Sequence, residues 1–111
     1  MLTLVLLPEQ PEGSAQETKQ VRTILAGLQD GKIERTLFTE NANTYFSDAA
    51  LQDAKASLRG LGKLKQVTWT EENLRGGMTR RSYRAEFEKK TLSLNIYLTP
   101  AGKFEQFLVT E

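Results

Sequence analysis

The sequence predicts an α+β fold in which N-terminal helices pack on a curved, four-stranded antiparallel meander. Apolar residues recur at helical spacing as far as Gly62 and alternate with polar residues after it, and turn-forming residues divide the second half into four strands. A chain of 111 residues fits one domain. Hydrophobic residues at 39% and charged residues at 26% are typical of a globular protein rather than a disordered one.

The predicted domain covers residues 15–111, and residues 1–14 precede it. An apolar run over residues 2–7, followed by prolines, fits either the remnant of a signal segment or a linker or short edge strand. The first interpretation places the protein in the periplasm or outside the cell. The run is far shorter than the roughly 20 residues that cross a membrane, so no membrane association is expected.

Three helical segments are expected before the strands. The first begins at Ser14, which forms a capping-box pattern with Glu17, and it ends at Asp30-Gly31. The second is short and is interrupted at Thr39, a helix-capping residue type, and the third follows Ser47 and ends at Gly60. The apolar residues at helical spacing are Val21, Ile24, Leu25, Leu28, Ile33, Leu37, Phe38, Leu51, Ala54, Leu58 and Leu61.

The turns between the strands predict a register. A tight hairpin around Lys89-Lys90 places Tyr83 opposite Ile96, and a three-residue loop over 100–102 places Ile96 opposite Gln106. The same loops set Phe87 opposite Leu92, Ala85 opposite Leu94, Leu98 opposite Phe104, and Leu94 opposite Leu108.

The first hairpin allows two alternatives. A three-residue loop over 75–77 places Trp69 opposite Tyr83 and Val67 opposite Ala85. A two-residue Gly-Gly loop turns Thr68 and Thr70 toward the apolar face instead, because a shift of one residue exchanges the two faces of a strand. The longer loop is therefore preferred.

On the inner face of the predicted sheet, one row of side chains runs across all four strands, and most of these side chains are apolar with a polar group at the end. Its members are Trp69, Tyr83, Ile96 and Gln106. A buried amide without partners costs about 1–3 kcal/mol, so Gln106 is expected either to hydrogen-bond within the fold or to face a cavity. The row is thus interpreted either as ordinary core or as a pocket for a small apolar ligand.

The outer face of the predicted sheet is polar, with a few large apolar side chains. Exposed apolar groups on a sheet face indicate an association surface, so a homodimer through this face is expected. The residues proposed for the dimer face are Arg84, Asn95, Tyr97, Phe107 and Val109.

Residues for catalysis and metal binding are scarce. The chain has neither cysteine nor histidine, which removes the usual zinc ligands and the side chain that titrates near neutrality. No catalytic residue, metal site or cofactor is therefore predicted. The net charge of +1 gives no attraction for nucleic acid, and the arginines of 75–84 are explained by ion pairing, with Glu71 opposite Arg81.

Several segments resemble the nuclear transport factor two-like superfamily. They are VRTIL at 21–25, ALQD at 50–53, LRGGMTRRSYRAEF at 74–87 and LSLNIYLTPAGKFEQFLV at 92–109. The resemblance covers about residues 15–111 and implies a cystatin-like, cone-shaped fold with a pocket, dimers through the sheets, and attachment to or association with periplasmic serine hydrolases. It implies no particular activity.

A noncatalytic ligand-binding, accessory or dimerisation module is the function that these features favour. The alternative is a small isomerase or cyclase that uses acid–base chemistry in the pocket. Asp53 and Glu40 are the only acids considered for it, and solvation on a helix surface explains both. That alternative depends on fold analogy alone.

Overall fold

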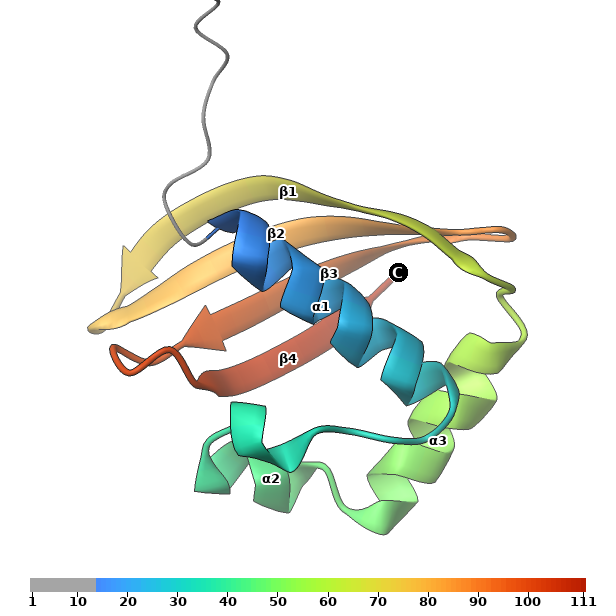
Figure 1. Cartoon of the computed structure of the whole chain (residues 1–111), viewed down its shortest axis with the longest axis horizontal. Coiled ribbons are helices and arrows are strands. Elements are labelled where there is room, and N and C mark those ends of the chain that lie inside the picture. The colour runs from blue at the N-terminus through green and yellow to red at the C-terminus, as the bar shows by residue number, and fades with distance from the viewer. Residues whose placement is uncertain (1–13) are drawn as a thin grey trace, which may run out of the picture.

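The computed structural model describes residues 14–111, so most of the predicted signal or linker segment lies outside them. Helices precede strands, and α1 lies across one face of a curved sheet, with α2 beside β4 and α3 beyond the end of α1 (Figure 1). The predicted α+β architecture is confirmed. The elements are α1 (Ser14–Gln29), a 3-10 helix η1 (Arg35–Leu37), α2 (Glu40–Tyr45), α3 (Asp48–Arg59), β1 (Leu64–Arg75), β2 (Met78–Phe87), β3 (Thr91–Leu98) and β4 (Phe104–Thr110).

Local sequence signals set the helix boundaries. The hydroxyl of Thr39 accepts a hydrogen bond from the Ala42 amide at 3.1 Å, and that of Ser47 accepts one from the Ala50 amide at 3.2 Å. Each hydroxyl satisfies an amide that has no partner within the first turn of its helix. These two predicted caps are confirmed, as are the helix ends before Gly31 and Gly60.

The four strands form one antiparallel sheet in the order β1-β2-β3-β4. Trp69 pairs with Tyr83, as predicted, but the loop that joins the two strands has two residues rather than three. Gly76 and Gly77 form it with φ angles of 57° and 83°, a left-handed conformation that glycine adopts without strain. An extra residue in β1, Thr70, forms a bulge that restores the register, so the predicted three-residue loop is wrong.

The second hairpin differs from the prediction by two residues. Tyr83 pairs with Leu94 instead of Ile96, so the tight turn around Lys89-Lys90 is wrong. The turn lies one residue earlier, at Glu88-Lys89, where Phe87 N–H donates to the Lys90 carbonyl at 2.8 Å, and the two amides of the turn bind the segment after α3. Glu88 N–H donates to the Lys63 carbonyl at 3.0 Å, and Lys89 N–H donates to the Leu61 carbonyl at 2.9 Å. A shift of two residues leaves the two faces of β3 unchanged.

The third hairpin contains the difference that matters most for the site. Leu98 pairs with Phe104, as predicted, but Tyr97 pairs with Gln106, so that Glu105 is an extra residue in β4. Because of this bulge, each later residue of β4 points to the sheet face opposite to the one predicted. Ile96 pairs with Phe107 rather than Gln106, and Leu94 pairs with Val109 rather than Leu108.

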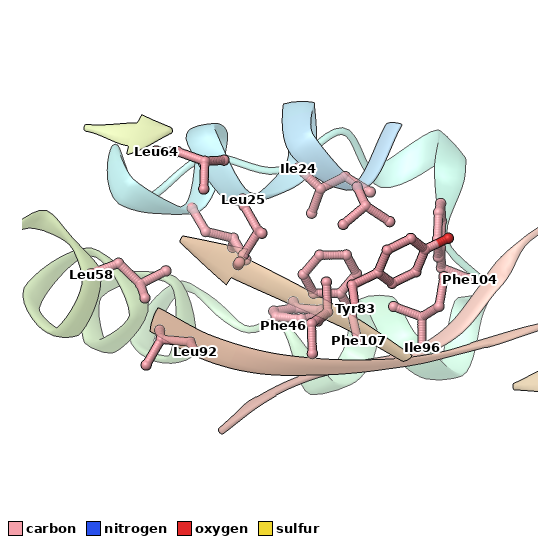
Figure 2. Close-up of a cluster of buried hydrophobic side chains, with 14 of the residues drawn as sticks. Ile24, Leu25, Phe46, Leu58, Leu64, Tyr83, Leu92, Ile96, Phe104 and Phe107 are labelled. Carbon is pink, nitrogen blue, oxygen red and sulfur yellow. The ribbon is translucent and has the colours of Figure 1, made fainter. Parts of the chain in front are cut away.

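The hydrophobic core lies between α1 and the inner face of the sheet. Figure 2 shows Ile24 and Leu25 of α1 near the aromatic rings of Tyr83, Phe104 and Phe107. An aromatic cluster closes the β4 side, where the Phe38 ring centre is 5.5 Å from that of Phe46 and 5.4 Å from that of Phe104. Side chains of α1 thus pack on the core from one side, and phenylalanine rings pack on it near α2.

Candidate functional site

The row of predicted pocket residues is not a row in the folded protein. Trp69 and Tyr83 are paired, and Tyr83 and Ile96 are buried on the inner face, but Ile96 pairs with Arg81 and Phe107. Gln106 is exposed, so its prediction as a buried amide is wrong, although its prediction as a cavity-lining residue agrees with a cavity between α2 and β4 that it lines. The Glu105 bulge causes the error, because it moves the residues after it to the opposite face.

A polar cluster, rather than a row of pocket residues, surrounds Tyr83. Arg81 is buried on the same face and forms ion pairs with Glu72 of β1 and Glu17 of α1. Burial raises the pKa of the Tyr83 hydroxyl above its ordinary value of 10.0, against the lowering effect of hydrogen bonds with Thr18 and Arg81. The predicted partner of Arg81, Glu71, is wrong, because the two-residue loop between β1 and β2 brings Glu72 opposite Arg81. This cluster joins α1 to the sheet.

Two cavities lie along β4, on the side of the sheet away from β1. We call them the α2 cavity and the α3 cavity. The α2 cavity measures about 390 Å³ and lies between α2 and β4, where Tyr45, Phe46 and Leu108 line it. The α3 cavity measures about 400 Å³ and lies between α3 and the ends of β3 and β4. Tyr45, Phe46 and Phe107 line both, so the two cavities adjoin.

The α3 cavity owes its space to one face of α3. Ala50, Asp53, Ala54, Ser57 and Leu58 line it, at the spacing of consecutive turns on one side of a helix. Three of the five side chains are very small, so they do not fill the space before the sheet. The opposite wall is apolar and comes from several elements, with Leu28, Leu61, Leu92, Phe107 and Val109.

The bulge at Glu105 supplies the aromatic and aliphatic part of that wall. It turns Phe107 and Val109 inward, and Figure 2 shows the Phe107 ring among the buried side chains. Both residues were predicted on the outer dimer face, and that placement is wrong: Phe107 is 6% exposed and Val109 packs against the core. The bulge therefore moves apolar surface from the predicted dimer face to the cavity.

The outer face retains the other three predicted dimer residues. Arg84 is exposed, and Asn95 and Tyr97 are partly buried. Asn95 is held within its own sheet, because its Oδ1 accepts hydrogen bonds from Arg80 at 2.8 Å and from the Ser82 hydroxyl at 2.7 Å. Leu108 takes the place of Phe107 on this side and is 42% exposed.

Metal-binding clusters and membrane-spanning helices were sought among residues 14–111. Within this range no group of three or more carboxylates lies close enough together to hold a metal ion. Of the helices in the same range, none has the length and hydropathy to cross a membrane. Comparisons with protein-family models, with curated proteins and with solved structures found no match.

Sequence reasoning missed the α3 cavity, although a signal for it is present. Ala50, Ala54 and Ser57 follow one another at intervals of three or four residues on a helix whose other buried positions hold leucine. Small side chains at helical spacing permit either close helix packing or an open space. Which of the two occurs depends on how near the sheet comes, and no local pattern predicts that distance.

Proposed function

We propose that this chain is a noncatalytic binding module that holds a small apolar ligand in the α3 cavity. The observation that carries the proposal is the wall of small side chains on α3 facing Leu28, Leu92 and Phe107 across about 400 Å³. Ligand sites are typically concave and mostly apolar, with a few polar groups, and here Asp53, Ser57 and Lys90 provide those groups.

The rival function, acid–base chemistry by a pocket carboxylate, has less support. Asp53 and Glu40 are both exposed to solvent. A general acid or base that works near neutral pH is usually tuned by burial or by a neighbouring charge. The resemblance to the nuclear transport factor two-like superfamily agrees with a pocket between helices and sheet, and we include membership in that superfamily in the proposal.

The neutral dye N-phenyl-1-naphthylamine tests the proposal, because its fluorescence rises in apolar surroundings. Ala54 lines the α3 cavity, so Ala54→Leu places three extra carbon atoms in it. We expect dye affinity to fall at least tenfold while the melting temperature stays equal or rises, since a filled cavity gains contacts.

Ala49→Leu is the matched control, because Ala49 is exposed on the same helix and does not line the cavity. It should leave both dye affinity and melting temperature unchanged. Dye binding that survives Ala54→Leu, or no dye binding by the wild-type chain, would reject the proposal.

We also propose that the chain forms a homodimer through the outer face, now with Leu108 in place of Phe107 and Val109. Leu108 lies opposite Asn95 and is one of the large exposed apolar residues of the described chain. Leu108→Glu should halve the mass measured by light scattering, whereas Leu74→Glu, at an exposed leucine near the tip of the first hairpin, should not. A wild-type chain that is monomeric at all concentrations rejects the dimer.

A further inference from the structure

The side chains that line the α3 cavity carry more negative than positive charge. Three charged side chains line it: Asp53 on α3, Lys90 in the turn before β3, and Glu111 after β4. Lys90 and Glu111 form an ion pair with each other. The hydrogen bond and the charge of Lys90 lower the pKa of the Glu111 carboxyl below its ordinary value. An ion pair has no net charge, so this pair adds none to the cavity.

Asp53 is left as the uncompensated charge. It lies on the helical wall, one turn from Ser57, and none of the ion pairs among residues 16–111 involves it. The Asp53 carboxylate and the Ser57 hydroxyl both have oxygen atoms that accept hydrogen bonds from an ammonium group. The cavity is therefore apolar inside and carries one negative charge and two acceptors on the α3 side.

An aromatic ring adds a second group that attracts cations. Tyr45 lines the same cavity and is 75% exposed, an unusual degree for a tyrosine that borders an apolar space. The face of a tyrosine ring attracts ammonium groups. A positively charged ligand gains from both groups, and a negatively charged ligand gains from neither.

We infer that the α3 cavity prefers hydrophobic cations, such as alkylammonium ions, over neutral or anionic molecules with the same apolar tail. The inference rests on the proposed function, because it assigns the ligand class of the same cavity. The tail lies against Leu28, Leu92 and Phe107, and the ammonium group donates hydrogen bonds to Asp53 and Ser57 at the rim.

Three probes with one tail test this inference on the full chain: octylammonium, 1-octanol and octanoate. Each competes with N-phenyl-1-naphthylamine at pH 7 and low ionic strength. An exposed ion pair contributes about 0.2–1 kcal/mol, so octylammonium should bind about 1.5- to fivefold more tightly than octanol. Octanoate should bind more weakly than octanol, and added salt should reduce both differences.

Asp53→Asn is the decisive variant, because it removes the charge and keeps the size of the side chain. It should bring octylammonium close to the affinity of octanol, leaving only the smaller contribution of Tyr45, without weakening octanol. Asp48→Asn is the matched control, since Asp48 is exposed on the same helix but does not line the cavity, and it should leave the order of the probes unchanged.

The results separate this inference from the proposed function. Octanol that binds, with octanoate equal to or tighter than octylammonium, overturns the charge preference alone. The same holds if Asp53→Asn leaves the order unchanged. If neither octanol nor the dye binds, or if Ala54→Leu does not weaken them, the proposed function itself fails.

Discussion

Arg81 of β2 lies directly opposite Glu72 of β1, and its guanidinium Nε is 2.6 Å from the Glu72 Oε1. The same guanidinium binds Glu17, which comes from α1. One buried cation therefore joins the first helix to the edge and the centre of the sheet.

Replacing Arg81 should destabilise the fold strongly. Arg81→Met leaves two carboxylates close together without their cation, and breaking a buried ion pair in this way typically costs 3–5 kcal/mol. We expect about 3 kcal/mol, the lower end of that range, because both carboxylates remain partly exposed to water. Urea unfolding measures the change.

Arg80→Met is the control for this prediction. Arg80 faces the other side of the sheet and pairs with Glu71, whose side chain is 59% exposed. The exposed pair contributes at most about 1 kcal/mol, and the hydrogen bond from Arg80 to Asn95 adds about 1 kcal/mol, so the control should cost clearly less than Arg81→Met. Equal losses from the two variants would show that the Arg81 cluster does not hold α1 on the sheet.

Neighbouring residues in β4 should respond very differently to alanine. Phe107 is buried, with its ring centre 6.1 Å from that of Phe104, and Phe107→Ala should cost about 3–5 kcal/mol as a large-to-small core change. Gln106→Ala should change stability by less than about 0.5 kcal/mol, because Gln106 is exposed. The opposite ranking, measured by thermal or urea unfolding, would mean that the strand lacks the Glu105 bulge.

The stability of the fold should decline at alkaline pH through Tyr83. Burial raises the pKa of its hydroxyl in the folded state above 10.0, so the folded state holds the proton more tightly than the unfolded state. The contribution is complete below pH 10 and is lost as the pH rises from there through the folded pKa. Tyr83→Phe should reduce this alkaline loss relative to wild type, as measured by unfolding between pH 8 and 11. An identical loss in the variant would assign the effect to other groups.

The elements of this fold could be predicted because their signals are local. A cap such as Ser47 or a stop such as Gly31 acts within one turn of a helix, and an apolar stripe is visible in a short stretch of sequence. The pairing of Trp69 with Tyr83 was also predicted, but for a wrong reason. The two-residue loop and the Thr70 bulge each shift β1 by one residue, and their effects cancel on that part of the strand.

The candidate site could not be predicted because it depends on non-local geometry. The Glu105 bulge exchanges Gln106 with Phe107 between the two faces, and no residue type in that stretch identifies the extra residue. The turn likewise lies at Glu88 and Lys89, whose amides bond to the carbonyls of Lys63 and Leu61, 25 and 28 residues away. Such partners are known only once the chain has folded.

The division of α3 into two faces has a consequence for how the protein changes over time. Leu51 and Leu58 are buried and hold the helix in place, while Ala50, Ala54 and Ser57 line the α3 cavity. Mutations at these three positions alter the size and shape of the lining without touching the residues that fold the helix. Single substitutions on this face of α3 can therefore reshape the cavity while the fold stays intact.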